Sequence, residues 1–170
     1  RFYSMDRDNR WERVKRGYDA IVYAHPKAKF DPVGYVGNSY SLGETDEFIE
    51  PVAFSDYEGI QDGDSVLTIN FRSDRMCEMV TAIGSDTFEA FERPNIKVNL
   101  ATITEYDKSF TYPILLKKDA PKNTLAEVIA DAGLRQLHTA ETEKYAHVTF
   151  FLNGGIDEPY ENETRVLVSS

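Results

Sequence analysis

The chain has 170 residues, of which 19 are basic and 29 acidic, so its formal net charge is −10. Non-specific nucleic-acid binding depends on Lys and Arg neutralising phosphates, and this acidic balance argues against it. Hydrophobic residues make up 41% of the chain, enough for a packed core, and no apolar run approaches the roughly 20 residues of a membrane span.

The N-terminal region is locally basic and begins abruptly. Six of the nineteen basic residues fall within the first sixteen positions: Arg1, Arg7, Arg10, Arg13, Lys15 and Arg16. A basic segment on an acidic chain favours a specific small anion over a polyanion. Because neither a starting methionine nor a signal peptide is present, we expect the chain to be an excised piece of a longer protein.

The first expected helix follows an aperiodic loop over residues 1–8. Asp8 or Asn9 is expected to cap it, with Glu12 completing a capping box. An apolar stripe at helical spacing is typical of core packing and consists of Trp11, Val14, Tyr18, Ile21 and Val22. A second helix is possible over residues 31–42, stopped by Gly43. An extended segment is expected over residues 48–54.

Residues 70–75, Asn-Phe-Arg-Ser-Asp-Arg, form the expected junction between a strand over 66–71 and a helix that extends to about Ile83. Anions bind where a strand ends at the N-terminus of a helix. Arg72 and Arg75 share one face if both are helical, and two guanidinium groups there suit a phosphate or carboxylate. The alternative is that both arginines pair with nearby acids such as Asp74 and Glu78 on the surface.

Strands and helices continue to alternate in the remainder. A short capped helix is expected at 85–89, with strands at 98–104 and 112–116, and this alternation predicts an α/β fold. Residues 117–122 are charged, contain proline and predict a linker.

The pattern after this linker begins afresh. The expected elements are a helix capped by Asn123 and closed by Gly133, a strand at 134–138, a helix or buried strand at 143–152 and a strand at 165–168. They are too few for an independent core and suggest a slice of a larger domain.

The cysteine and histidine residues of the chain give little indication of a catalytic or metal-binding site. Cys77 is the only cysteine, which excludes an internal disulfide and a cysteine-based zinc site and fits a reducing compartment. The histidines, at 25, 138 and 147, lack the paired spacing of a metal site. His147 lies in an apolar run and is expected in the core. By themselves, the residues indicate an α/β anion-binding fragment.

Three stretches resemble the cofactor-independent phosphoglycerate mutases. They are Arg-Phe-Tyr-Ser-Met-Asp-Arg-Asp with Arg-Trp-Glu-Arg (residues 1–13), Asn-Phe-Arg-Ser-Asp-Arg (70–75) and Ala-Glu-Thr-Glu-Lys-Tyr-Ala-His-Val-Thr-Phe-Phe with Asn-Gly-Gly (140–155). Shorter matching pieces lie between them in the same order, so the resemblance runs the length of the chain. The chain is similar to an internal fragment of these enzymes.

The resemblance implies an isomerase of the alkaline-phosphatase superfamily that interconverts 3- and 2-phosphoglycerate in glycolysis and gluconeogenesis. A phosphoserine intermediate and two manganese ions are implied, without added 2,3-bisphosphoglycerate. The parent enzyme is expected to be a cytoplasmic monomer with no nucleic-acid or membrane partner. Because the nucleophilic serine and the metal ligands lie outside this chain, we expect the fragment to have no mutase activity alone and to bind substrate weakly.

The implied fold has two parts. Residues 1–118 would form most of an inserted phosphotransferase domain, with a mixed sheet flanked by helices. Residues 119–170 would form a partial piece of the metal-binding, alkaline-phosphatase-like α/β domain. Closure of the two domains would hold the substrate and exclude water from the phosphoserine.

The resemblance assigns substrate binding to five basic residues: Arg1, Arg7, Arg72, Arg75 and Lys144. Lys144 would also reach the phosphorylated serine and the substrate phosphate. Two alternatives stay open. The N-terminal pair lies at a cut terminus that need not be ordered, and Lys144 could be a surface lysine paired with Glu141 or Glu143.

Two other functions fit the same residues. One is a non-catalytic phosphate- or carboxylate-binding module that has lost the metal domain. The other is a phosphatase or phosphomutase of the same superfamily with a different substrate. Aspartate and serine ligands upstream in the parent reading frame would favour the enzyme over the module, and activity profiling would separate the substrates.

Overall fold

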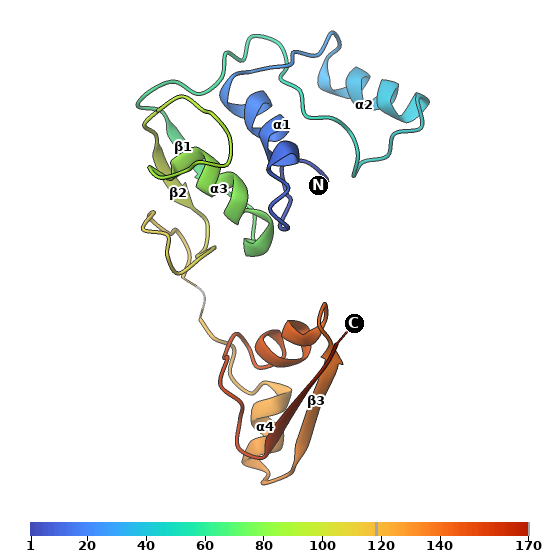
Figure 1. The fold of residues 1–170 in the computed structure, drawn as a ribbon, viewed down its shortest axis with the longest axis vertical. Helices are drawn as coiled ribbons and strands as arrows, with labels where there is room; N and C mark the ends of the chain where they lie inside the picture. Colours follow the sequence, from blue (N-terminus) through green and yellow to red (C-terminus); the bar gives the residue numbers. More distant parts are fainter. Residues whose placement is uncertain (118, 170) are drawn as a thin grey trace. The chain divides into compact units, whose positions relative to one another are not determined.

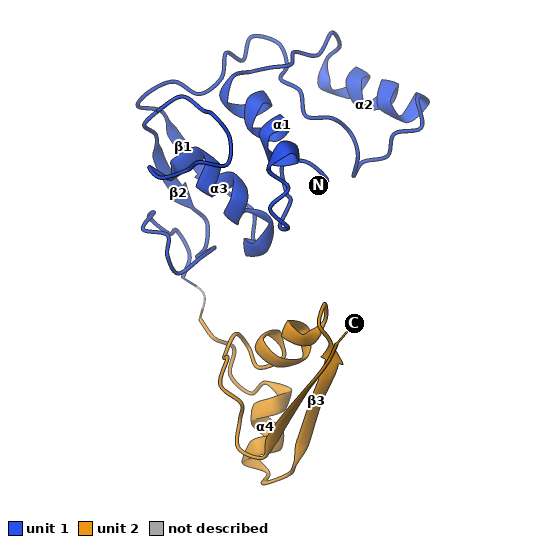
Figure 2. Ribbon diagram, viewed as in Figure 1, with its two compact units in different colours: residues 1–117 blue, residues 118–170 orange. Residues whose placement is uncertain are grey.

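The computed structural model describes residues 1–117 and 119–169 and divides the chain into two compact units, residues 1–117 and 118–170 (Figures 1 and 2). The first unit contains the helices α1, α2 and α3 and the strands β1 and β2. The second contains α4, β3, β4 and a short π-helix, η2. The expected linker, residues 117–122, includes Lys118, which lies outside the described residues.

Helix α1, Trp11–Val22, provides much of the core of the first unit. Val14, Tyr18 and Val22 are buried, as the helical spacing predicted, whereas Ile21 is 36% exposed at the edge of the stripe. Trp11 packs against Phe88, with ring centroids 5.2 Å apart.

The start of α1 differs from the prediction. The N-cap residue is Arg10, and no side chain within residues 1–117 and 119–169 caps the helix. The expected cap Asn9 instead adopts a left-handed φ of 57°. The carboxylate of Asp6 takes over the local hydrogen bonding, because its Oδ2 accepts the N–H groups of Asp8 and Arg10, both at 2.9 Å.

Helix α2, Pro32–Ser41, confirms the possible helix at 31–42. The side chain of Asp31 caps it by accepting the N–H groups of Val33 and Gly34, and the chain turns away at Gly43 with a φ of 82°. Proline at the first helical position lacks an N–H that would be unpaired anyway. Figure 1 shows α2 apart from the helices α1 and α3.

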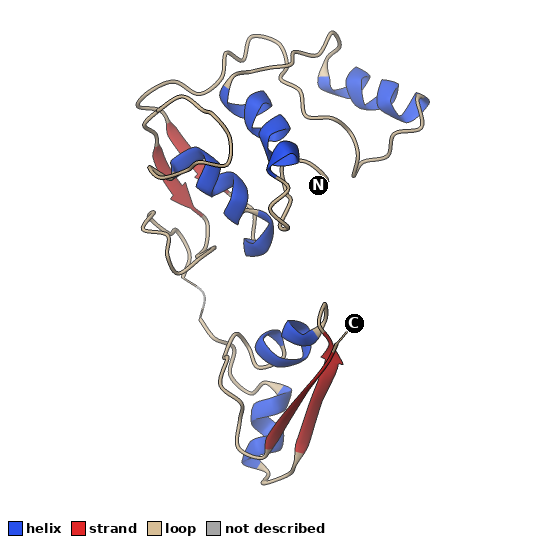
Figure 3. Cartoon of the chain, viewed as in Figure 1, coloured by secondary structure: helices blue, strands red, loops and turns tan. Residues whose placement is uncertain are grey.

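Strands β1, Ser65–Thr68, and β2, Asn99–Thr102, form a parallel pair in which Ser65 lies opposite Asn99. The connection runs through helix α3, Cys77–Gly84. The buried residues of α3 include Met79, Val80 and Ile83, which join the two apolar clusters of this unit. A strand, a helix and a parallel strand thus form the scaffold that carries residues 70–75 (Figure 3).

Two shorter predictions in this unit fail. Residues 85–89 form one turn, at 86–87, instead of a helix, because Ser85 Oγ accepts the N–H of Thr87 and competes with helical hydrogen bonding. Residues 112–116 make one isolated bridge, between Thr102 and Ile114, instead of a strand. Proline at 113 has no N–H to donate to a ladder.

The second unit pairs strand β3, Gln136–Glu141, with strand β4, Glu163–Val168. Helix α4, Leu125–Asp131, precedes them, and η2, His147–Phe151, lies between them in sequence. Thr124, and not Asn123 as predicted, caps α4 in a capping box with Glu127. The α/β class is confirmed. A mixed sheet was expected, whereas both ladders among the described residues are parallel, since helical segments connect their strands.

None of the helices formed by residues 1–117 and 119–169 is long and apolar enough to cross a bilayer.

Two helical glycines allow a matched test of the packing between α1 and the N-terminal loop. A Cβ on Gly17 would lie 2.8 Å from Ser4 Cβ and 3.0 Å from its Cα, whereas a Cβ on Gly37 of α2 would meet nothing within 4 Å. We expect Gly17→Ala to lower the free energy of unfolding by about 1–3 kcal/mol through overpacking. Gly37→Ala should raise it by about 0.5–1 kcal/mol through helix propensity.

Urea unfolding monitored by the fluorescence of Trp11, the only tryptophan in the chain, measures both variants in the first unit. Equal effects of the two substitutions would contradict the close contact between Ser4 and Gly17.

Candidate functional site

The candidate site lies where the chain passes from β1 to α3. Arg72 precedes a 3-10 turn, η1, Ser73–Arg75, and α3 begins two residues later. The side chain of Asn70 accepts the N–H of Arg72 at 2.9 Å, and the hydroxyl of Tyr106 donates to the carbonyl of Asn70 at 2.7 Å. Arg72 is extended, with φ −86° and ψ 93°, so the condition under which the two arginines would share a helical face is not met.

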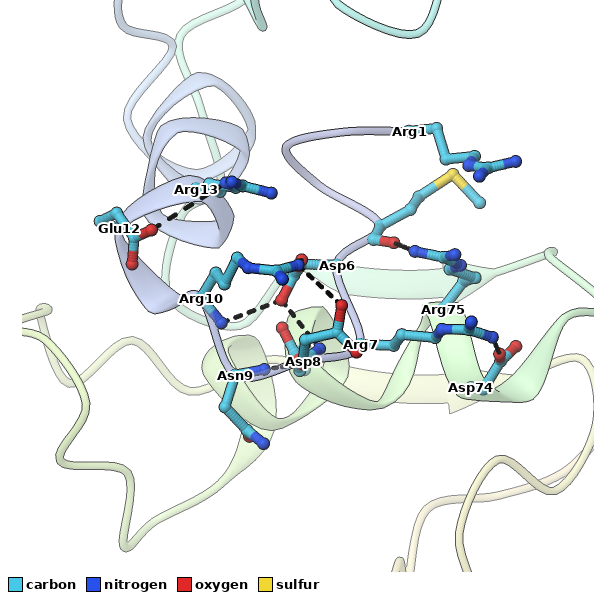
Figure 4. Close-up of polar contacts among 12 residues, drawn as sticks. Arg1, Asp6, Arg7, Asp8, Asn9, Arg10, Glu12, Arg13, Asp74 and Arg75 are labelled. Carbon is cyan, nitrogen blue, oxygen red and sulfur yellow. Dashed lines mark hydrogen bonds and ion pairs between the residues drawn. The ribbon is translucent and has the colours of Figure 1, made fainter. Parts of the chain in front are cut away.

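The N-terminal loop, residues 1–10, packs against this junction. Arg75 Nη1 donates to the carbonyl oxygen of Met5 at 2.9 Å, and Arg7 Nη1 donates to Asp74 Oδ2 at 2.9 Å. Figure 4 shows the side chains of Arg1, Arg7 and Arg75 on the same side of the loop. The structure therefore brings the N-terminal arginines to the junction arginines, with 67 and 70 positions between the contacting residues.

The four arginines form an arginine cluster, defined here as Arg1, Arg7, Arg72 and Arg75. Burial lowers the pKa of Arg75, and the positive charges of Arg7, Arg1 and Arg72 lower it further. Its Nε is buried without a hydrogen-bond partner among the described residues. A buried donor without an acceptor is costly, and the mutual repulsion of the four positive charges means that a bound anion would stabilise the cluster.

Two acids already contact the arginine cluster. Asp74 lies between two guanidinium groups, with Oδ2 2.9 Å from Arg7 Nη1 and Oδ1 3.2 Å from Arg72 Nε. Arg1 Nε lies 3.3 Å from Glu47 Oε1. Partial burial opposes the ionisation of Asp74, but the hydrogen bonds from the two arginines outweigh it, so its pKa falls below the ordinary value.

The alternative that the junction arginines pair with nearby acids is therefore confirmed for Asp74 and wrong for Glu78. Arg72 does pair with Asp74. Glu78, in contrast, is buried on α3 and accepts the backbone N–H of Asn9 at 2.9 Å.

Sequence reasoning missed the acids beneath the loop. Asp6 is only 3% exposed and Glu78 only 7%. Asp6 lies within the most basic segment of the chain, and this position was a signal that its carboxylate could be buried among positive charges. For Glu78 the local pattern gave no signal, because its burial depends on a loop 69 positions away.

Lys144 lies in the second unit, in the turn between β3 and η2. Its side chain is exposed, its backbone N–H donates to the carbonyl of Glu141 at 2.9 Å, and no ion pair joins its ammonium group to another residue within 1–117 and 119–169. The pairing with Glu141 or Glu143 is thus absent from this part of the chain. The role of Lys144 in substrate binding stays a prediction.

The buried histidine of the second unit is His138, and not His147, which is exposed. His138 Nδ1 lies 3.3 Å from Glu163 Oε1. The Glu163 carboxylate also accepts Asn153 Nδ2 and the N–H of Tyr160, both at 2.9 Å. Burial opposes its ionisation, but these bonds and that from Arg165 keep the pKa of Glu163 below its usual value.

The described residues contain no group of three or more His, Cys, Asp or Glu side chains placed to hold a metal ion. The two manganese ions implied by the resemblance therefore do not fit a ligand set within this part of the chain. The chemistry that the site itself offers is the binding of an anion by guanidinium groups.

Comparison with known proteins gives consistent matches. The family model described as BPG-independent PGAM N-terminus matches residues 1–108. The chain is 71% identical over 170 residues to the 2,3-bisphosphoglycerate-independent phosphoglycerate mutase of Sulfurimonas denitrificans and 54% identical to that of Aliarcobacter butzleri. Each match covers 100% of the chain and 35% of the relative, so the chain spans about a third of the length of these relatives.

A solved structure is also similar. The crystal structure of Leishmania mexicana phosphoglycerate mutase at low cobalt concentration matches with a TM-score of 0.70 and 28% sequence identity. The match covers 99% of the chain and 33% of the solved chain.

Replacing Asp74 tests whether the arginine cluster has capacity for an external anion. In Asp74→Asn the groups of Arg7 and Arg72 lose their internal carboxylate, so we expect inorganic phosphate to bind about two- to fivefold more tightly, the range of exposed ion pairs. Isothermal titration at low ionic strength measures this. The control is Asp56→Asn, which removes the same charge at an exposed position. Weaker binding in Asp74→Asn than in the control would contradict the prediction.

Proposed function

The chain belongs to the family of BPG-independent phosphoglycerate mutases, and from this premise we propose that it is part of an enzyme that interconverts 3- and 2-phosphoglycerate without added 2,3-bisphosphoglycerate. The observation that carries the proposal is the arginine cluster, because four guanidinium groups from two distant segments meet at one strand–helix junction.

The arginine cluster suits a substrate with two anionic groups. Each guanidinium group can donate two parallel hydrogen bonds to a phosphate or carboxylate. Phosphoglycerate carries both groups, so arginines from the loop and from the junction can hold its two ends together.

Substrate binding would change the partners of Asp74. Its carboxylate accepts from Arg7 and Arg72 in the structure. A substrate oxygen would replace or share these bonds. The exchange costs little, because an ion pair with a half-exposed side chain contributes only about 0.2–1 kcal/mol.

Phosphoryl transfer depends on positioning and on neutralisation of charge more than on proton movement. We assign to Arg1, Arg7, Arg72 and Arg75 the binding of the glycerate part while the phosphoryl group is carried by the parent enzyme's serine. Lys144, from the second unit, would contact that phosphoserine and the substrate phosphate. Two manganese ions would supply Lewis-acid chemistry in the parent enzyme, bound by ligands outside the described residues.

The two units fit the division of labour proposed for the parent. Residues 1–118 would belong to the phosphotransferase domain and residues 119–170 to the metal-binding phosphatase-like domain. We further propose that the parent acts as a monomeric glycolytic and gluconeogenic enzyme of the cytoplasm.

An enolase-coupled assay of the full parent protein, without 2,3-bisphosphoglycerate, tests the proposal. We expect turnover with manganese and its loss with chelator. Arg72→Ala and Arg75→Ala should each lower kcat/KM about 10- to 100-fold, since each removes hydrogen bonds between charged groups. Lys29→Ala, which removes an exposed positive charge elsewhere in the first unit, is the control.

No turnover with manganese would overturn the mutase assignment and favour a binding module. Turnover on another phosphorylated acid or sugar would point to a related phosphomutase or phosphatase.

The chain of 170 residues should be inactive by itself. In the same coupled assay we expect no turnover above the rate without protein, because the described residues contain no metal-ligand set. Measurable turnover by this chain would contradict the division of the active site between it and the rest of the parent.

A further inference from the structure

Two acidic side chains are buried beneath the N-terminal loop, outside the arginine cluster. Asp6 is 3% exposed and Glu78 is 7% exposed. Burying two like charges side by side is costly unless they are paired or one of them is neutral. The burial of both carboxyl groups therefore needs a compensating interaction.

The two carboxyl groups divide the N–H groups of the loop between them. Asp6 Oδ2 accepts from the N–H groups of Asp8 and Arg10, and Glu78 Oε1 accepts from the N–H of Asn9, all at 2.9 Å. Three consecutive backbone donors thus bind two acids, one on the loop and one on α3. Figure 4 shows Asp6 beside Arg10, with Arg7 leaving the same loop towards Asp74.

One oxygen of Glu78 has no donor. Its Oε2 is buried and has no hydrogen-bond partner among the described residues. An ionised oxygen there would carry an uncompensated charge. A protonated Oε2 would carry no charge and could instead donate to the carboxylate of Asp6, whose negative charge and hydrogen bonding with Glu78 both raise the pKa of Glu78.

The surroundings of the two acids shift their pKa values in opposite directions. Burial raises the pKa of Glu78, and the negative charges of Asp6 and Asp8 raise it further, against the hydrogen bond from Asn9. For Asp6, burial opposes ionisation, but the N–H groups of Arg10 and Asp8 and the charge of Arg10 outweigh it and lower its pKa. Two neighbouring carboxyl groups with opposite shifts are the arrangement in which one proton is shared.

We propose that Asp6 and Glu78 form a carboxyl–carboxylate pair that shares one proton and positions the arginine-bearing loop on α3. In the sequence, Asp6 lies between Met5 and Arg7, the two loop residues that contact Arg75 and Asp74 of the junction. Glu78 is a positioning residue, because it acts on substrate only through the loop. The effect of Glu78 on substrate binding rests on the proposed function, whereas the proton-sharing pair does not.

The pair works within a window of pH. The pKa of Glu78 is raised, so its contribution is complete at low pH and is lost as pH rises through its folded value. The pKa of Asp6 is lowered, so its contribution is lost as pH falls through its folded value. The other charged groups are Asp8 and Arg10, whose Nη1 lies 3.5 Å from Asp6 Oδ1. Arg75 directs its Nη1 to Met5 instead.

Amide hydrogen exchange of Asn9, measured by NMR on the whole chain, tests the pair. Glu78→Gln can still accept from Asn9 and donate to Asp6, whereas Glu78→Ala can do neither. We expect exchange of the Asn9 amide to accelerate about tenfold or more in Glu78→Ala and to stay within about threefold of wild type in Glu78→Gln. Thr81→Ala, which removes a different hydrogen bond on α3, is the control and should leave Asn9 unchanged.

The shared proton gives a second readout. As pH rises through the titration of Glu78, its ionised carboxylate is repelled by that of Asp6, and the loop is held less firmly. The Asn9 amide of the wild type should therefore lose protection relative to Glu78→Gln at the same pH, because the amide side chain does not ionise. Equal acceleration in Glu78→Gln and Glu78→Ala, or an effect no larger than that of Thr81→Ala, would overturn the proposal.

The parent enzyme tests the link to substrate. We expect Glu78→Ala to raise KM for phosphoglycerate more than it lowers kcat, and Glu78→Gln to restore KM. An active parent with unchanged KM in Glu78→Ala would overturn the positioning role. A parent without mutase activity would overturn the proposed function alone, since the exchange experiment tests the pair without it.

Discussion

Three hydrogen bonds hold the N-terminal loop against the start of α3, and the arginine cluster depends on them. Arg75 binds the carbonyl of Met5, Arg7 binds Asp74, and the N–H of Asn9 binds Glu78. The residues they join are 67 to 70 positions apart. Closing so long a loop costs conformational entropy. The packing of α1 on α3, through Val14, Met79 and neighbouring apolar residues, offsets this cost.

Charge in the first unit is arranged so that positive groups meet in a chain that is acidic overall. The formal net charge is −10, yet four guanidinium groups lie together. Like charges repel, so they are held by acids at their edges, Asp74 and Glu47. The same guanidinium groups that fix the loop are donors that an anion of suitable shape can use.

The second unit is organised around a different buried charge. Glu163 at the start of β4 accepts from Asn153 and Tyr160 and pairs with His138 on β3. This joins the two strands and the turn after η2. The apolar residues Leu137 and Leu167 on the strands remain more than half exposed. A two-stranded sheet with short helices cannot cover both of its faces.

The sequence by itself determined the local elements: the core stripe of α1, the possible helix that became α2, and a strand–helix junction that carries Arg72 and Arg75. Helical period and turn residues act between near neighbours, so they can be recognised without the fold. Only the tertiary structure decided that Asp6 binds the N–H of Arg10 before α1, that Glu78 is buried, and that Arg7 reaches Asp74. These contacts join residues far apart in the chain, and no local pattern specifies which distant backbone will bury a given carboxyl group.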